Sequence, residues 1–265
     1  MPPACRSSGA EIARAAPTSF PRRALAALSL IALAVPRPAS AMHLADGILP
    51  LGWAALWSVV AVVGVAIGLV RLRRRVHDDR RVRPLVALVA ALVFVLSCMP
   101  IPVPLVGTCS HPCGTGIAAL LVGPWLTILV TVAALLLQAL FLAHGGFTTL
   151  GADVVSMGIA GAFVGWAAFH ALRRAGAPLG VAAFAAGLLS DWATYAVTSL
   201  ELATALHGAR PLGVTAVTIF AAFLPTQIPL GILEGLLAAG AVRFLQRRRP
   251  DLLVRAGLAA AGEAA

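Results

Sequence analysis

Met42 and His43 directly follow Ala39-Ser40-Ala41, three small residues that match a signal-peptidase cleavage site. Cleavage there would make Met42 the first residue and would place its free amine one residue from the imidazole of His43. The amine, the backbone nitrogen of residue 43 and its imidazole could then bind one divalent metal ion as three adjacent ligands. Cleavage would therefore create a metal-binding site.

His111 is the second candidate ligand. It lies between residues 100 and 116, where four prolines before Cys113 and three glycines exclude a regular helix. The segment carries no charged residue, so it can lie within a membrane if protein surrounds it. Taken singly, His43 could be incidental and His111 could cap a turn. Together with the amine and the backbone nitrogen they offer four nitrogen ligands in a plane, which is typical of Ni(II) or Cu(II).

A zinc site is the competing interpretation. Cys109 and Cys113 flank His111, and thiolates with imidazole are typical tetrahedral zinc ligands. We rank this alternative second because the chelate at Met42 and His43 favours planar nitrogen coordination. The two cysteines could also form a disulfide, although nothing in the sequence requires one.

Further polar residues could hold the ligands in place. These are Cys109, Ser110 and Cys113 around His111, and His144 and Asp153 in the next outer loop, where Asp153 could instead N-cap the following helix. Asp191, Gln227 and Glu234 lie inside later apolar runs, where buried polar groups more often join helices than bind a substrate.

Composition predicts an integral membrane protein. The chain is 60% hydrophobic and 11% charged, with a mean hydropathy of +0.94, whereas soluble domains carry roughly 25% charged residues. Its net charge of +10 comes from arginines that lie in short clusters between apolar runs, a pattern that marks membrane topology rather than nucleic-acid binding. His-Glu-x-x-His, Gly-x-Ser-x-Gly and phosphate-loop motifs are absent from the sequence, so we expect no ATP hydrolysis by this chain.

Residues 1–41 match a secretory leader. Arg22-Arg23 precede a short apolar run that ends at Val35, well below the roughly 20 residues a membrane span needs. We therefore expect a leader over 1–41, a transmembrane metal-binding domain over 42–250 and a frayed tail over 251–265. An uncleaved anchor remains an alternative because Pro36 and Pro38 lie close to the cut.

The arginine clusters at 71–83, 173–174 and 243–249 predict the cytoplasmic side. A single helix over residues 117–143 would place Arg173 outside, so we divide this run at Gly123-Pro124 and predict a half-helix over 113–122 that brings His111 near mid-membrane. The full spans are expected at 53–70, 85–99, 126–142, 153–172, 179–200 and 214–245, the last irregular at Pro225 and Pro229. The fold class is an all-α polytopic protein of about seven segments in the inner (plasma) membrane, with the mature N-terminus outside and the C-terminus cytoplasmic.

Short motifs follow one another in an order typical of one family: Met42 to Pro50, Gly107 to Pro112, Gln138 through His144-Gly145-Gly146 to Gly158, Asp191 to Leu200, and Thr226 to Pro229 with Glu234-Gly235. With these motifs the chain resembles the CbiM/NikM family, the substrate-specific membrane components of energy-coupling-factor transporters for cobalt and nickel. The resemblance covers most of residues 42–245. Cys113 and Asp153 depart from it, since threonine and asparagine are usual at these two positions.

The resemblance implies an ion held by the Met42 amine, the backbone nitrogen and imidazole of His43, and the imidazole of His111. It implies six core helices plus an extra N-terminal one. The partners would be a small accessory membrane subunit, a transmembrane coupling protein and cytoplasmic ATPase subunits. Co(II) or Ni(II) would be the transported substrate, and no cofactor is implied.

We therefore expect a subunit that captures Co(II) or Ni(II) from outside for import. Two alternatives stay open: a membrane metal sensor or receptor, which would bind metal without ATPase-dependent uptake, and an intramembrane zinc enzyme. The ligand types suit both nickel and cobalt, so the sequence does not choose between the two ions.

Overall fold

The computed structural model describes residues 44, 46–99, 101–103, 108–142 and 145–259, with the backbone alone for residues 102–103 and 108–109. The predicted leader lies outside these residues. The description below concerns the part of the chain that follows residue 43.

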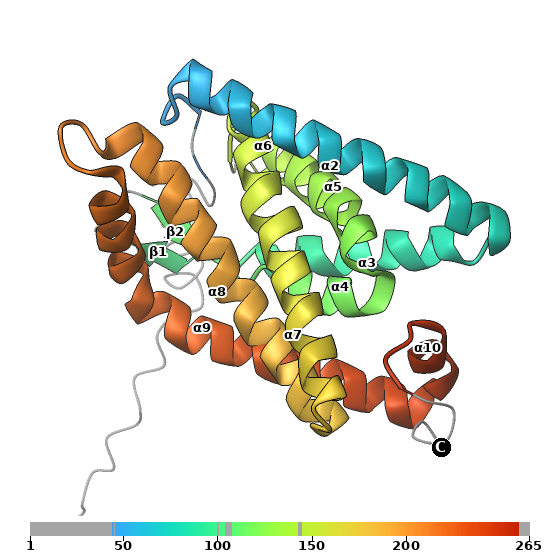
Figure 1. The fold of residues 1–265 in the computed structure, drawn as a ribbon. Helices are drawn as coiled ribbons and strands as arrows, with labels where there is room; N and C mark the ends of the chain where they lie inside the picture. The colour runs from blue at the N-terminus through green and yellow to red at the C-terminus, as the bar shows by residue number, and fades with distance from the viewer. Residues whose placement is uncertain (1–43, 45, 100, 104–107, 143–144, 260–265) are drawn as a thin grey trace, which may run out of the picture. The chain divides into compact units, whose positions relative to one another are not determined.

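The described residues form helices joined by short connections (Figure 1). They are α2 (Leu51–Asp78), α3 (Val82–Ser97), α4 (Thr115–Val122), α5 (Pro124–Phe141), α6 (Leu150–Asp153), the π-helix η1 (Val154–Gly161), α7 (Ala162–Arg174), α8 (Leu179–Leu206), α9 (Leu212–Arg248) and α10 (Pro250–Arg255). Two three-residue strands, β1 (Ile101–Val103) and β2 (Thr108–Ser110), pair antiparallel between α3 and α4.

The all-α membrane fold is confirmed. Five helical segments are long and apolar enough to cross a membrane, with α6, η1 and α7 counted as one, and α3 is a shorter apolar helix. Together with α4 they correspond to the seven segments expected from the sequence. The π-helical stretch was not expected; such stretches are rare and occur often at functional sites.

The predicted half-helix is α4. It ends at Gly123, whose φ of +84° and ψ of 157° are essentially restricted to glycine, and Pro124 then opens α5 at a position where its missing N–H costs nothing. Eight residues extend about 12 Å, well short of a hydrocarbon core of about 30 Å. The Nη1 atom of Arg75 donates to the carbonyl of Val122 at 2.7 Å. This bond fixes this end of α4 beside the arginine-rich turn, residues 71–83, which includes the end of α2 and the start of α3. The opposite end therefore lies deeper in the bundle, where every residue from Ser110 to Leu120 is buried.

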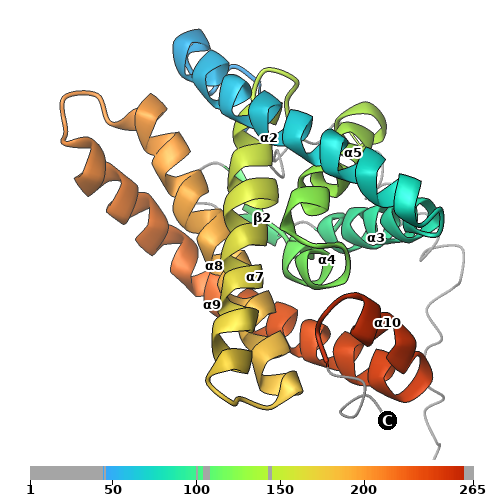
Figure 2. The ribbon, with the colours of Figure 1, turned by 45° about the vertical axis from the view of Figure 1, so that its right-hand side comes forward.

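Close helix packing surrounds α4. The helices α8 and α9 lie side by side over much of their length (Figures 1 and 2). A Cβ atom added at Gly187 of α8 would lie 2.5 Å from the carbonyl oxygen of Glu234 in α9, and one added at Gly116 would lie 2.8 Å from the carbonyl oxygen of Ala186. Small residues are required here because the backbones themselves are in contact.

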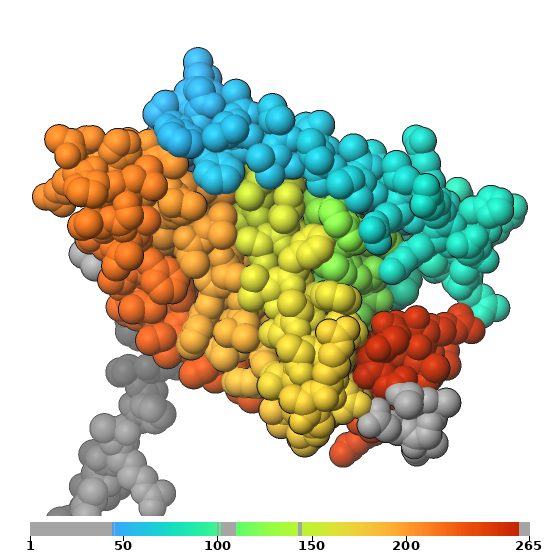
Figure 3. Space-filling model, in the orientation of Figure 1, coloured from blue at the N-terminus to red at the C-terminus, as the bar shows by residue number. Residues whose placement is uncertain are grey.

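Two outer features complete the bundle. The helix α2, blue in Figure 3, covers one edge and presents many apolar side chains outward, as expected of a helix in contact with lipid. Pro225 and Pro229 lie inside α9, which continues through both, and Figure 1 shows that α9 changes direction along its length. This fits the predicted irregularity, because proline kinks a helix that it does not end.

Two expectations about the chain's charged segments are wrong. The spans expected at 53–70 and 85–99 leave residues 71–83 as a loop, but these residues are mostly helical, since α2 runs to Asp78 and α3 begins at Val82; arginine is a good helix former. The segment after Pro250 forms α10 instead of a frayed tail over its described part. Leu253 and Leu258 are buried there, and their burial holds the segment against the bundle.

Candidate metal site

The first described residue, Leu44, lies inside the bundle. Its side chain is 1% exposed, its N–H donates to Oδ1 of Asp153 at 3.4 Å, and its carbonyl accepts a hydrogen bond from the hydroxyl of Thr149. Met42 and His43 lie outside the described residues. The residue that directly follows them is thus buried and bound to both ends of α6.

Asp153 therefore has a different role from the predicted helix cap. Thr149 is the residue before α6, and Asp153 is the last residue of that short helix. The Asp153 carboxylate accepts a hydrogen bond from the backbone N–H of Leu44. The prediction that Asp153 supports the metal site remains a prediction.

The loop before α6 also binds the segment before α2, through Thr148 and Asp46. Oδ1 of Asp46 accepts from the backbone N–H of Thr148 at 2.8 Å and from its hydroxyl at 2.5 Å, and these bonds hold the pKa of Asp46 below its ordinary value. A Cβ atom at Gly146 would clash with the same carboxylate, so glycine allows the approach. His144 lies outside the described residues.

His111 is 2% exposed and is bound on both sides of its backbone by one phenol. Its N–H donates to the Tyr195 oxygen at 2.9 Å, and the Tyr195 hydroxyl donates to the His111 carbonyl at 3.2 Å. The ring Nδ1 lies 3.0 Å from the carbonyl oxygen of Pro112. Because a carbonyl only accepts, we assign the proton to Nδ1, and a neutral ring in this form carries its lone pair on Nε2. This is the tautomer that binds a metal through Nε2.

The neighbouring Ser110 is buried and linked to α9. The side-chain amide of Gln227 donates to the Ser110 hydroxyl, while the backbone carbonyl of Gln227 accepts from the indole N–H of Trp192 at 3.0 Å. The Gln227 side chain thus joins α9 to β2 rather than to another helix, and its backbone carbonyl joins α9 to α8.

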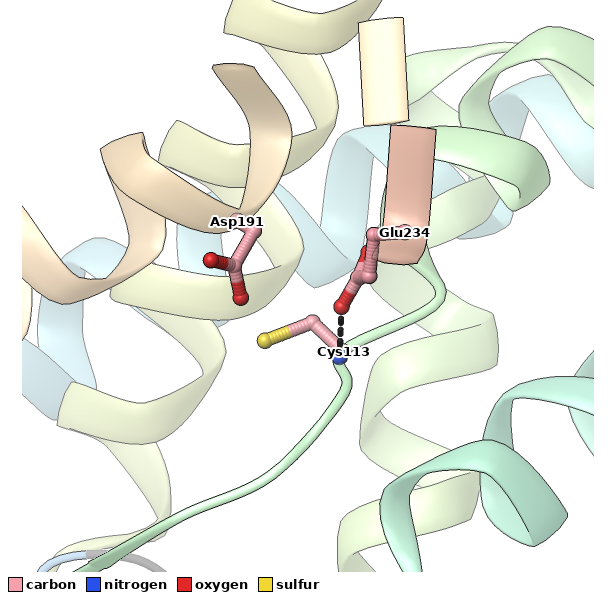
Figure 4. Close-up of side chains that lie close together, drawn as sticks. All are labelled: Cys113, Asp191 and Glu234. Atoms are coloured by element: carbon pink, nitrogen blue, oxygen red, sulfur yellow. Dashed lines mark hydrogen bonds between the residues drawn. The ribbon is translucent and has the colours of Figure 1, made fainter. Parts of the chain in front are cut away.

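Glu234 joins α9 to the start of α4. Its carboxylate accepts a hydrogen bond from the backbone N–H of Cys113. The backbone nitrogen of Gly114 lies 3.2 Å from each of the two carboxylate oxygens and donates to both. Cys113 is a buried free thiol and not part of a disulfide. Ligand-type atoms of Cys113, Asp191 and Glu234 all lie within 4.8 Å of one another (Figure 4). The ring of His111 is not part of this group, and the side chain of Cys109 is not described, so the alternative zinc site is not assembled among the described residues.

Sequence reasoning missed two buried carboxylates as candidates. It treated Asp191 as a helix-joining residue, yet both of its buried oxygens lack a hydrogen-bond partner. Glu201 was not considered because the predicted span ends at residue 200, whereas α8 continues to Leu206 and buries the Glu201 carboxylate without a hydrogen-bond partner. The available signal was an ionisable residue within or beside an apolar run.

Comparisons with known proteins agree on one family. Residues 43–252 match the family described as "CbiM: Cobalt uptake substrate-specific transmembrane region". The chain is 60% identical over 225 residues to "Cobalt transport protein CbiM" of Geobacter sulfurreducens, and 62% identical over 214 residues to the protein of the same name from Sorangium cellulosum. The matches cover 85% and 81% of this chain. The chain spans 65% of the length of the first relative and 95% of the second.

Solved structures show the same fold. The chain is similar to "Crystal Structure of an Truncated Transition metal Transporter", with a TM-score of 0.68 at 24% identity, over 78% of this chain and 99% of the other. The structure titled "Crystal Structure of an transition metal transporter" gives the same score and identity over 78% of this chain and 93% of its own.

Proposed function

Because the chain belongs to the CbiM family of cobalt uptake substrate-specific transmembrane proteins, we propose that it is the substrate-binding membrane component of an energy-coupling-factor transporter that captures and imports Co(II) or Ni(II). In this proposal the leader is removed after Ala41. The ligands are the Met42 amine, the backbone nitrogen and imidazole of His43, and Nε2 of His111.

The observation that carries this proposal is the position of Leu44. Its side chain is buried, and its N–H and carbonyl are bonded to Asp153 and Thr149. Since Met42 and His43 directly precede this buried and hydrogen-bonded residue, the proposed N-terminal ligands would start next to the bundle interior.

The four proposed nitrogen ligands determine how the ion would be captured. The ion exchanges water for nitrogen ligands, and the amine and the backbone amide must give up protons to bind it. The Nδ1 contact with the Pro112 carbonyl and the Tyr195 clamp orient His111 for this step, as partners of metal-bound imidazoles commonly do. Both Co(II) and Ni(II) suit the set.

The remaining parts of the proposal concern partners and orientation. The mature N-terminus faces outside and the arginine-rich turns face the cytoplasm, where a transmembrane coupling protein and ATPase subunits act on the chain, together with a small accessory membrane subunit. ATP hydrolysis belongs to those separate subunits. The chain itself is proposed to bind and release the ion without chemical conversion.

The test is N-terminal sequencing and metal analysis of the purified protein, with and without leader cleavage. Ala41→Leu puts a large residue at the cut and should leave the chain uncleaved and unable to bind Co(II) or Ni(II). The control Ser40→Ala keeps a small residue and should be cleaved and bind normally. Tight binding by the uncleaved chain would refute the amine ligand. Normal binding without ATPase-dependent uptake in cells that carry the partner subunits would favour a sensor.

A further inference from the structure

Cys113, Asp191 and Glu234 bring three metal-ligand types together from three separate parts of the fold. Cys113 precedes α4, Asp191 lies in α8 and Glu234 lies in α9, and all three side chains are buried. A thiol sulfur and two carboxylates thus meet within 4.8 Å (Figure 4). A divalent ion lies about 2.0–2.3 Å from such donors, so small side-chain rotations would bring all three onto one ion.

Asp191 indicates that this group is built to hold a ligand. Both of its oxygens are buried without a hydrogen-bond partner, and Figure 4 shows its carboxylate directed toward the space beside the Cys113 sulfur. Among the residues that the structure describes, no basic side chain forms an ion pair with Asp191 or Glu234. A buried carboxylate left in this state is unfavourable unless a proton or a cation compensates it.

Glu234 is already fixed in place by the backbone. It accepts the N–H groups of Cys113 and Gly114 at the start of α4. A carboxylate has about four acceptor positions, so these bonds leave capacity for an ion. The same bonds orient Glu234 as partners around metal-bound carboxylates commonly do.

The group lies next to His111, on the arginine-rich side. In α8, Asp191 lies one turn before Tyr195, the residue that bonds the His111 backbone. Asp191 is therefore nearer to the start of α8, which follows the arginine pair at 173–174. Along α9, Glu234 lies about two turns beyond Gln227, toward the arginines that end the helix. In both helices, therefore, Asp191 and Glu234 lie between the residues that contact the His111 segment and the helix end next to the arginines.

The geometry points to a second cation site formed by Cys113, Asp191 and Glu234, which receives the ion after it leaves the nitrogen ligands. One sulfur and two oxygens suit a tetrahedral ion, whereas the nitrogen set at His111 suits a planar one. Binding would release the thiol proton. The identity of the ion as the transported Co(II) rests on the proposed function, but the existence of the second site does not.

The test is a Co(II) titration of the purified mature chain, followed by absorption spectroscopy. The wild-type protein should bind two equivalents and show a sulfur-to-cobalt charge-transfer band in the near ultraviolet. Cys113→Ser should lose the band, and the near-isosteric Asp191→Asn should lose one equivalent while still folding. The matched control is Cys98→Ser, at the other described free cysteine, which should keep both.

His111→Ala separates the two proposals. It should remove the nitrogen site and leave the sulfur band in place. One equivalent without a band in the wild type, or a band that survives Cys113→Ser, would overturn the second site and leave the proposed function standing. Binding that depends on Cys113 but not on His111 would instead refute the proposed capture site.

Discussion

Tyr195 is expected to set the affinity for the ion without touching it. Its phenol accepts from the His111 N–H at 2.9 Å and donates to the His111 carbonyl at 3.2 Å, so Tyr195→Phe leaves two buried backbone groups without this partner. An unsatisfied buried group costs about 1–3 kcal/mol. Because part of this cost falls equally on the metal-free protein, we expect binding to weaken roughly 10- to 100-fold, the range common for partners that orient a metal ligand.

The assay is isothermal titration of the mature protein with Co(II) and Ni(II), with thermal unfolding measured in parallel. Ser199→Ala is the matched control, since Ser199 lies one turn further along α8 and donates only to the backbone carbonyl of Tyr195, at 2.6 Å. It should leave the affinity unchanged. If Tyr195→Phe lowers the unfolding temperature but binds metal as tightly as the wild type, Tyr195 supports the fold alone and the reasoning about His111 fails.

Three further predictions concern stability. Gly187→Ala places a Cβ atom 2.5 Å from the Glu234 carbonyl oxygen and should destabilise the protein by about 1–3 kcal/mol, measured as a lower unfolding temperature. Gly123→Ala brings its Cβ atom only into ordinary contact with the Arg75 guanidinium, at 3.5 Å, but forces a φ of +84° on alanine; a cost of about 1–3 kcal/mol with Co(II) affinity retained would confirm that the break after α4 depends on backbone conformation. The Thr148 bonds lower the pKa of Asp46 from 3.8; its stabilisation is therefore present above pH 3.8 and is lost as the pH falls through the lower folded value. Asp46→Asn should remove that part of the acid transition, and an unaltered pH profile of unfolding would contradict it.

The helical segments could be predicted because helix-breaking residues and clusters of charge are visible in a short stretch of sequence. Gly123-Pro124 marks the division of α4 from α5, and the parity of the arginine clusters requires it. The bond from Arg75 to Val122 shows that this end of α4 does lie at the arginine-rich turn. The helix α10 was not predicted, because Leu253 and Leu258 are too few to form a periodic apolar pattern; only the structure shows that both are buried.

The candidate site was predictable only in part. His111 was recognisable from its uncharged Pro/Gly-rich segment, but its clamp by Tyr195 joins residues 84 positions apart and leaves no trace in spacing. The bond from Glu234 to Cys113 spans 121 positions. In lipid, apolar residues cover both faces of a helix, so the side that Asp191 faces cannot be read from periodicity. Such pairs become visible only when α4, α8 and α9 are packed together.

The bond between Arg75 and α4 also has a mechanical consequence. One end of α4 is fixed to the last turn of α2, and the other end carries the backbone N–H groups that hold Glu234. A helix of this length acts as a stiff strut of about 12 Å, because axial compression would break its internal hydrogen bonds. We therefore expect a displacement of the last turn of α2 along the axis of α4 to be passed on to the N–H groups that hold Glu234, without unfolding of α4.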